Sequence, residues 1–581
     1  MNGLAIILIA IAVLGGGYLF YGRWLVKKWG IDPKAKTPAY AHEDGQDYVP
    51  APKQIVFAHQ FSTIAGAGPV TGPIIAAMFG WLPALLWILV GGVFFGAVQD
   101  FGALYASVKN EGKSIGLIIE QYIGKTGKRL FLMFCWLFSL LVIAAFGDMV
   151  ASTFSAAVAD KSYAIGAAVT VSAKTAPSAA AGSISLFYIL GAVLFGLFLK
   201  YDKPNQLVMF LTGVGLFVAM MAAGMAFPIY LNKMQWLLVV FAYIFFAAVV
   251  PMWILMQPRD YLSSFLLIFM ILGAVVGIFI TQPSMNLKPV TSFNVNGKML
   301  FPMLFVTIAC GAVSGFHSLV SSGTSSKQIR NEKDMLPVGY GAMVVESLLA
   351  VAALVVAGAA AKNGKLPSGT PFQIFSAGVA GFFQKFGMSQ YVAKCSMTMC
   401  VSALCLTTLD SVARIGRMSM QELLYDEDGR AHTPVTKFLT NKYVSTVVTL
   451  AFGFVLSLGG YNNIWSLFGS ANQLLAALVL IALAVFLKTT GREGWMLYVP
   501  MSVMLVVTMT ALVMAVGNIF VKIGAGKFVL LTDGLQLIVA VLLMALAVMV
   551  AYHCLRKLFE KPAKENRSGK PVLDADEVAA K

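Results

Sequence analysis

The sequence predicts an all-α polytopic membrane protein with about 15 transmembrane helices, two of them broken. Hydrophobic residues make up 59% of the 581 residues and charged residues only 12%, about half the charged share of a soluble domain. Apolar runs of about 20 residues recur along the whole chain and leave no room for a soluble domain between them. Two of these runs contain glycines, prolines or clustered hydroxyl residues that a simple anchor helix does not need.

The loops between the apolar runs alternate in charge. Loops after odd-numbered spans contain lysine and arginine, whereas loops after even-numbered spans contain few. By the positive-inside rule, we expect the N-terminus outside and the C-terminus in the cytoplasm. The net charge of +16 then belongs to these loops and not to a nucleic-acid-binding surface. The predicted spans are 3–24, 55–79, 81–108, 130–157, 182–199, 206–229, 235–256, 261–281, 300–326, 337–361, 392–413, 440–458, 463–487, 496–517 and 530–553.

One transmembrane domain is expected over residues 1–558, followed by a polar cytoplasmic tail over 559–581. The first apolar run lacks a basic segment before it and has basic residues after it, which indicates a retained helix and not a signal peptide. Residues 371–386 are a candidate re-entrant or interfacial segment. The six cysteines have no CxxC spacing, so neither disulfides nor structural zinc is expected.

The second span, 55–79, contains the run from His59 to Pro73, which includes three glycines and two prolines. Proline removes a backbone donor, and glycine costs about 1 kcal/mol relative to alanine within a helix. In hydrocarbon, backbone groups freed in this way persist only inside protein or beside a water-filled cavity. The run therefore predicts a broken helix at a ligand site, although small residues also serve close helix packing.

The ninth span, 300–326, is a second candidate broken helix, with glycines, serines and one histidine. The loop charges predict that it runs inward, opposite to span 55–79. Two interrupted helices of opposite direction are typical of inverted-repeat transporters, which bind substrate and coupling ions between them. Each histidine has an alternative role as a hydrogen-bonded packing residue. The candidate substrate-binding residues are His59, Ser62, Ala65, Gly66, Gly68, Gly311, Ser314, Gly315 and His317.

Span 392–413 supplies a candidate site for a coupling cation, with Na⁺ as the candidate metal and no transition metal expected. In inverted-repeat transporters a sodium site lies between the first and eighth core helices, which here correspond to spans 55–79 and 392–413. The alternative is an ordinary ion pair between Asp410 and Arg414, one helical turn apart. The candidate coupling-ion residues are Thr407, Thr408, Asp410, Ser411 and Ala65.

Three further carboxylates, Asp100, Asp148 and Glu346, are candidate proton carriers because ionisable groups within a membrane are costly unless they have a function. Asp100 is also close enough in sequence to Lys109 to be interfacial. For Asn472 and Gln473 we expect interhelical hydrogen bonds.

Several long motifs together resemble the carbon starvation protein A (CstA) family. They are the runs His59–Pro73, Gln99–Phe101, Pro251–Leu262, Cys310–Ser326, Thr407–Arg417 and Trp465–Leu475. The resemblance implies a bacterial inner-membrane secondary transporter for peptides or pyruvate, used under nutrient limitation. It also implies an inverted-repeat core like that of the amino acid–polyamine–organocation (APC) superfamily, which is LeuT-like, and a small soluble accessory protein as a partner.

The residues and the resemblance together predict a symporter driven by H⁺ or Na⁺, without a cofactor. A carboxylate substrate, either pyruvate or a peptide C-terminus, suits the exposed N–H groups at half-helix ends. A membrane enzyme is disfavoured because the chain has no HExxH, GxSxG, nucleotide-binding or redox-ligand motif. A nutrient sensor without transport and a channel remain alternatives.

Overall fold

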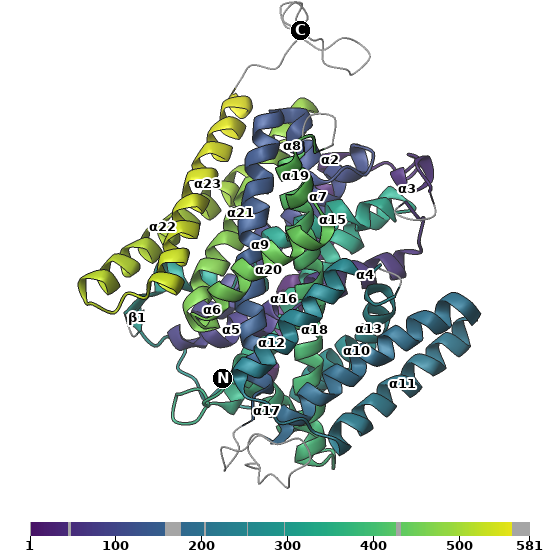
Figure 1. Ribbon diagram of the computed structural model, residues 1–581, viewed down its shortest axis with the longest axis vertical. Coiled ribbons are helices and arrows are strands. Elements are labelled where there is room, and N and C mark those ends of the chain that lie inside the picture. Colours follow the sequence, from purple (N-terminus) through teal and green to yellow (C-terminus); the bar gives the residue numbers. More distant parts are fainter. Residues whose placement is uncertain are drawn as a thin grey trace, which may run out of the picture.

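The computed structural model describes residues 2–44, 48–156, 176–202, 205–251, 254–295, 297–425 and 431–559. Helices dominate these residues, and a two-stranded hairpin joins β1 (Asn294–Val295) to β2 (Lys298–Met299). The predicted cytoplasmic tail lies outside the described residues from position 560 onward. Figure 1 shows the helices gathered into one bundle.

The first half of the chain forms α1 (Gly3–Gly16), η1 (Gly17–Gly22), α2 (Arg23–Trp29), α3 (Pro38–Ala41), α4 (Lys53–Ile64), α5 (Gly68–Ala76), η2 (Ala77–Phe79), α6 (Trp81–Gly91), η3 (Gly92–Gly96), α7 (Ala97–Lys109), α8 (Ile115–Ile123), α9 (Lys125–Phe154), α10 (Ala176–Asp202), α11 (Gln206–Ala226), α12 (Lys233–Val249) and α13 (Met256–Thr281).

The second half forms α14 (Leu300–Thr307), α15 (Gly315–Gly323), η4 (Ser325–Lys327), η5 (Glu332–Asp334), η6 (Leu336–Gly341), α16 (Ala342–Ala360), α17 (Pro371–Gln384), α18 (Gln390–Leu424), α19 (Pro434–Leu439), α20 (Lys442–Ser457), α21 (Tyr461–Thr489), α22 (Trp495–Gly524), η7 (Leu530–Gly534) and α23 (Leu535–Phe559). The segments η1, η3, η6 and η7 are π-helical, and η2, η4 and η5 are 3₁₀ turns.

Eleven helices among the described residues are long and apolar enough to cross a membrane, or up to twelve if the bent pair α4–α5 is one span. The predicted spans at α12 and α20 form helices of 17 and 16 residues. A 17-residue helix is about 26 Å long, slightly short of the roughly 30 Å hydrocarbon core. The predicted span 300–326 forms two helices of 8 and 9 residues. The count of fifteen spans stays a prediction.

The centre of the bundle is occupied by α21, whose most apolar stretch is entirely buried, together with α9 and α18. By contrast, only 22% of the most apolar stretch of α11 is buried, so most of that helix is left to face lipid. Figure 1 shows α10 and α11 at one edge of the bundle, and α22 and α23 at another. Polar side chains on the central helices are therefore held within protein.

Two predicted segments differ in extent from their helices. Helix α18 continues to Leu424, eleven residues beyond its predicted end at 413. It continues because arginine is a good helix former, and because the Arg414 side chain donates to the last carbonyls of α12, Ala247 O and Val250 O, at 3.0 Å each. Residues 371–386 form α17, which begins with a capping box at Thr370 and packs against α16 and α18. Its re-entrant or interfacial placement stays a prediction.

Candidate functional site

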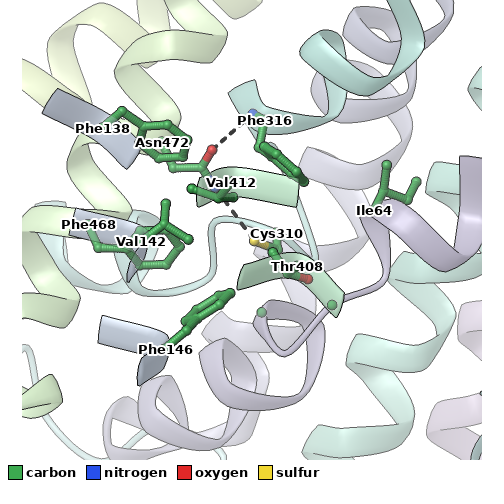
Figure 2. A pocket seen from close by; sticks show the side chains of 12 residues that line it. Ile64, Phe138, Val142, Phe146, Cys310, Phe316, Thr408, Val412, Phe468 and Asn472 are labelled. Carbon is green, nitrogen blue, oxygen red and sulfur yellow. Dashed lines mark hydrogen bonds between the residues drawn. The ribbon is translucent and has the colours of Figure 1, made fainter. Parts of the chain in front are cut away.

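A small cavity lies between the two broken helices, at the centre of the bundle (Figure 2). Its volume is about 20 Å³, room for about one water molecule. Three phenylalanines, Phe138, Phe146 and Phe468, form one side of it, and Ile64 lies on the other. The lining residues are Ile64, Gly66, Gly68, Phe138, Val142, Phe146, Cys310, Phe316, Thr408, Val412, Phe468 and Asn472.

The first break separates α4 from α5 over residues 65–67, where the helix axis bends by 43°. Helix α4 ends because Ala65 adopts φ −74° and ψ 56°, outside the helical region. Helix α5 restarts at Gly68 with a proline in its first turn, where the missing N–H costs nothing. Thr408 of α18 approaches Gly66, and Cys310 approaches Gly68, so closely that a Cβ has no space at either glycine.

The second break, residues 308–314, leaves the last carbonyls of α14 without helical partners. Side chains from two other helices bind them. Gln473 Nε2 donates to Phe305 O at 2.6 Å, and Trp465 Nε1 donates to Thr307 O at 3.3 Å. Trp87 Nε1 of α6 donates to Ile308 O at 3.3 Å. The freed backbone groups are therefore satisfied inside protein, as a membrane requires.

Asn472 of α21 holds the other end of this break. Its Oδ1 accepts from the N–H of Phe316 at 3.1 Å, and its Nδ2 donates to Ser314 Oγ at 3.0 Å. Nδ2 also lies 3.6 Å from Cys310 Sγ, as the dashed lines in Figure 2 indicate. The predicted interhelical hydrogen bonds of Asn472 and Gln473 are thus confirmed. The sequence did not predict that Asn472 also lines the cavity. The one sequence feature that could have indicated this role is the adjacent pair Asn472 and Gln473 in an otherwise apolar run.

Of the predicted substrate-binding residues, Gly66 and Gly68 line the cavity, and Ala65 is buried beside them. Gly311 packs against Ala350 of α16, and Gly315 packs against α21, so their small size serves close helix approach. The aromatic lining was missed because a buried phenylalanine looks the same in sequence wherever it packs.

The remaining predicted residues of this group have other partners. His59 Nε2 lies 3.0 Å from Thr324 Oγ1, just beyond the end of α15. Ser62 donates to the backbone carbonyl of His59 within its own helix at 3.2 Å. Neither lies among the cavity-lining residues. Ser314 reaches the cavity only through its hydrogen bond to Asn472.

His317 joins two of the predicted proton carriers in one buried cluster. Its Nδ1 lies 2.9 Å from Asp100 Oδ2 on α7, and its Nε2 lies 3.4 Å from Glu346 Oε2 on α16. All three side chains are fully buried. Asp100 is thus enclosed by protein and paired with His317, whereas Lys109 pairs with Glu332 at 2.6 Å. Within the described ranges, no three His, Cys, Asp or Glu side chains are arranged to hold a metal ion.

Asp148, the third predicted proton carrier, is separate from this cluster. Its carboxylate pairs with Lys233 of α12 at 2.7 Å and accepts from the N–H of Tyr461 at 2.8 Å. Tyr461 is the first residue of α21, where a helix leaves N–H groups unsatisfied and favours negative charge. The contacts of Asp148 are those of a helix cap.

The predicted coupling-ion group is divided between two surroundings. Asp410 turns its carboxylate to α12 and α13, where Oδ2 contacts Arg259 Nη1 and accepts from the Tyr243 hydroxyl at 2.5 Å. The alternative pairing of Asp410 with Arg414 is wrong, because Arg414 binds the end of α12. The partner Arg259 was missed because a basic residue after a proline reads as part of an inner loop.

The two threonines of the same group face differently. Thr408 lies against Gly66 at the cavity, as the expected approach of the two spans requires. The hydroxyls of Thr407 and Thr408 donate to carbonyls of their own helix, Ala403 O at 2.9 Å and Leu404 O at 3.2 Å. Their lone pairs remain available to a cation, but Asp410 does not share that space.

The many apolar helices indicate a multi-pass membrane protein, and comparison with known proteins identifies its family and the transporter class. The family model for carbon starvation protein CstA matches residues 2–366 and 361–511. The chain belongs to this family, which confirms the resemblance carried by its motifs.

Three curated relatives support the same class. The chain is 32% identical to the peptide transporter CstA of Escherichia coli, over 88% of this chain and 81% of that protein. It is 28% identical to the peptide transporter CstA of Bacillus subtilis, over 93% and 95%. It is 30% identical to the pyruvate/proton symporter BtsT of Escherichia coli, over 88% and 81%. These relatives are named as transporters, in agreement with a protein that is not an enzyme.

Among solved structures, a manganese transporter of Eremococcus coleocola aligns with a TM-score of 0.48 and 10% identity, over 89% of this chain and 99% of that one. At this level of likeness we assign neither an inverted repeat nor a substrate from it.

Proposed function

We propose that this protein is a secondary active symporter that imports pyruvate, peptides or both across the bacterial inner membrane under carbon starvation, driven by a gradient of H⁺ or Na⁺. The observation that carries the proposal is the cavity where two broken helices meet. The second break is held by hydrogen bonds from side chains of another helix, and Thr408 and Cys310 pack closely against the glycines of the first, as expected of a lasting ligand site. The names of the relatives support transport and both substrate classes.

The small volume of the cavity favours a carrier over a channel. It has room for about one water molecule, so a substrate enters only if the surrounding helices move. Inverted-repeat transporters move in this way, by rocking one set of helices against another around a fixed site. The proposed core is such an APC/LeuT-like repeat, with the N-terminus outside, the C-terminus in the cytoplasm and a soluble accessory protein as a candidate partner.

A monocarboxylate suits the lining of the cavity. No lysine or arginine lies among its described lining residues. The negative charge of the substrate is then met by the N-terminus of α5 at Gly68. The phenylalanines provide an apolar surface for a methyl group or for the side chain of a peptide.

The coupling ion is better supported as H⁺ than as Na⁺. A sodium site needs several oxygens around one point, and the carboxylate of Asp410 is turned to Arg259. The pyruvate relative is named as a proton symporter.

Uptake into proteoliposomes tests the proposed function. Labelled pyruvate and a labelled dipeptide are each offered with an imposed H⁺ gradient or an imposed Na⁺ gradient, and protein-free liposomes are the control. We expect accumulation of at least one substrate under the H⁺ gradient. Absence of uptake with both substrates under both gradients would refute the symporter and leave the sensor. Gradient-independent flux without accumulation would indicate a channel.

A further inference from the structure

We propose that Asp100, His317 and Glu346 form the site that binds the coupling proton, with the His317 imidazole shared between two carboxylates. This inference rests on the proposed transport function. It assigns the coupling role to this cluster and not to the group around Asp410. The cluster joins three helices, α7, α15 and α16, and lies on the second broken segment.

The hydrogen-bond geometry of the cluster calls for added protons. Both ring nitrogens of His317 face carboxylate oxygens, at 2.9 Å and 3.4 Å. A neutral imidazole has a single N–H, so one of these contacts needs a proton on the imidazole or on the carboxyl group. Only the contact between Nδ1 and Asp100 has hydrogen-bond geometry. His317 Nε2, Asp100 Oδ1 and both oxygens of Glu346 lack hydrogen-bond partners among the described residues. A buried charged carboxylate without partners costs several kcal/mol.

The charge balance leads to the same conclusion. With a neutral imidazole and two ionised carboxyl groups, the cluster carries −2. One added proton leaves −1, and a second makes it neutral. Since the three side chains are fully buried, the neutral state is the one that the interior favours. Contact with water on either side of the membrane would permit proton release.

No nearby cation replaces these protons. The helices α1, α5, α6 and α17 and the segment η3, which pack on α16, carry no titratable side chain. The charged and titratable residues on the other elements packed against α15 and α16, or in the second break, are Lys53 and His59 on α4, Tyr105 and Lys109 on α7, Glu120 and Tyr122 on α8, Arg259, Asp260 and Tyr261 on α13, Lys327 on η4, Tyr340 on η6, Tyr461 and Lys488 on α21, and Cys310 in the break. Glu332, Lys333 and Asp334 lie on η5, which contacts η6.

Two basic groups on the elements that pack against the cluster helices have other partners. Lys109 pairs with Glu332, and Arg259 pairs with Asp410 and Asp260. Tyr340 donates its hydroxyl to Val93 O at 2.9 Å. Within the described residues, no lysine or arginine forms an ion pair with the cluster. Among the described residues, this cluster included, no three His, Cys, Asp or Glu side chains are arranged to hold a metal ion.

The cluster is coupled to the cavity through the chain itself. His317 directly follows Phe316, whose ring lines the cavity and whose N–H is bound by Asn472. Gln99, next to Asp100, donates to Ser314 O at 2.7 Å. A movement of α15 therefore alters both the cavity and the proton cluster. The π-helical segments η3 and η6 directly precede the helices that carry Asp100 and Glu346, and π-helical turns occur frequently at functional sites.

The test separates proton movement from substrate movement. Proteoliposomes contain a pH-sensitive dye, and the substrate accepted by the wild-type protein is added outside. Glu346→Gln and Asp100→Asn should reduce substrate-evoked proton entry to the level of empty liposomes, while exchange of labelled for unlabelled substrate, without a gradient, continues. Ser347→Ala is the matched control, a buried neighbour on α16 whose hydroxyl binds only its own helix, and it should keep both activities.

Wild-type proton-to-substrate ratios in both variants would overturn the proton site. If the wild-type protein itself exchanges no substrate, this result would instead count against the proposed function. A second measurement needs no transport: infrared difference spectra between high and low pH should contain the C=O band of a protonated buried carboxyl group. That band should be absent from Glu346→Gln or Asp100→Asn, and if both variants retain it in full the inference is wrong.

Discussion

Asp410 and Arg259 form a buried ion pair whose partners lie far apart in sequence, with 2% or less of either side chain exposed. The Tyr243 hydroxyl bridges them, since it donates to Asp410 at 2.5 Å and accepts from Arg259 at 2.8 Å. The pair connects α18 to α13, and the hydroxyl adds α12. At this scale an ion pair in the protein interior contributes chiefly by fixing which helices meet.

Removing one partner alone leaves an uncompensated buried charge. We expect Arg259→Leu to lower the free energy of unfolding by about 3–5 kcal/mol. The double variant Arg259→Met with Asp410→Leu should regain most of that loss, because it buries no charge. Denaturant unfolding of the purified protein in detergent, followed by circular dichroism, measures both. A loss under about 1 kcal/mol for the single variant, as for an exposed pair, would contradict the buried assignment.

The broken helices are the elements that make the site, and their close contacts constrain them. Gly66 lies against Thr408, so a side chain at Gly66 would force α4–α5 and α18 apart. Overpacking of this kind costs about 1–3 kcal/mol. We expect Gly66→Ala to reduce substrate accumulation strongly, and Gly66→Ala with Thr408→Ala to restore much of it, because the second change removes the obstructing hydroxyl.

Gly215→Ala on the peripheral helix α11 is the control for this prediction, since nothing lies near the added methyl group. It should transport like the wild-type protein and gain slightly in helix stability. Initial uptake rates and the amount of folded protein are measured for all four forms. If the double variant transports no better than Gly66→Ala, the contact with Thr408 is not what requires glycine.

For the broken helices, the sequence predicted the position of the first break but not the side chains that bind the second. Glycine and proline between His59 and Pro73 correctly predicted a break in that helix, because their backbone properties are local. The partners of the second break were not predictable, because Trp87, Trp465 and Asn472 lie far from it in sequence. Their indole and amide groups look like ordinary interior residues until the fold brings them to a free carbonyl or N–H.

For the whole molecule, the apolar runs predicted the helices, whereas the partners of the buried charged side chains were not predicted. For Asp100 the alternative was a place near Lys109, and for Asp410 it was a pair with Arg414, because a sequence shows which side chains are neighbours on one helix but not which helices meet. The fold instead pairs Asp100 with His317 and Asp410 with Arg259. Both charge clusters arise from tertiary packing. The proposed proton site and the ion pair that joins helices therefore could not be told apart from the sequence alone.

A carrier must open its central cavity during each cycle, and Cys310 gives access to that movement. It lines the cavity, whereas the other five cysteines are buried outside its lining. We expect a small membrane-permeant thiol reagent to inactivate transport by reacting at Cys310, and saturating substrate to slow the reaction. Mass spectrometry of the labelled peptide checks the site, and Cys310→Ala should be resistant. Equal labelling rates with and without substrate would argue that substrate does not occupy this cavity.

Two tryptophans that bind freed carbonyls at the end of α14 make the second break visible by fluorescence. An indole changes its ultraviolet emission when its N–H loses a hydrogen bond or its surroundings become wetter. Two of the nine tryptophans, Trp87 and Trp465, hold the second break directly. Any rearrangement of that break during transport therefore alters the intrinsic fluorescence of the protein, and the motion at its centre can be followed without an attached dye.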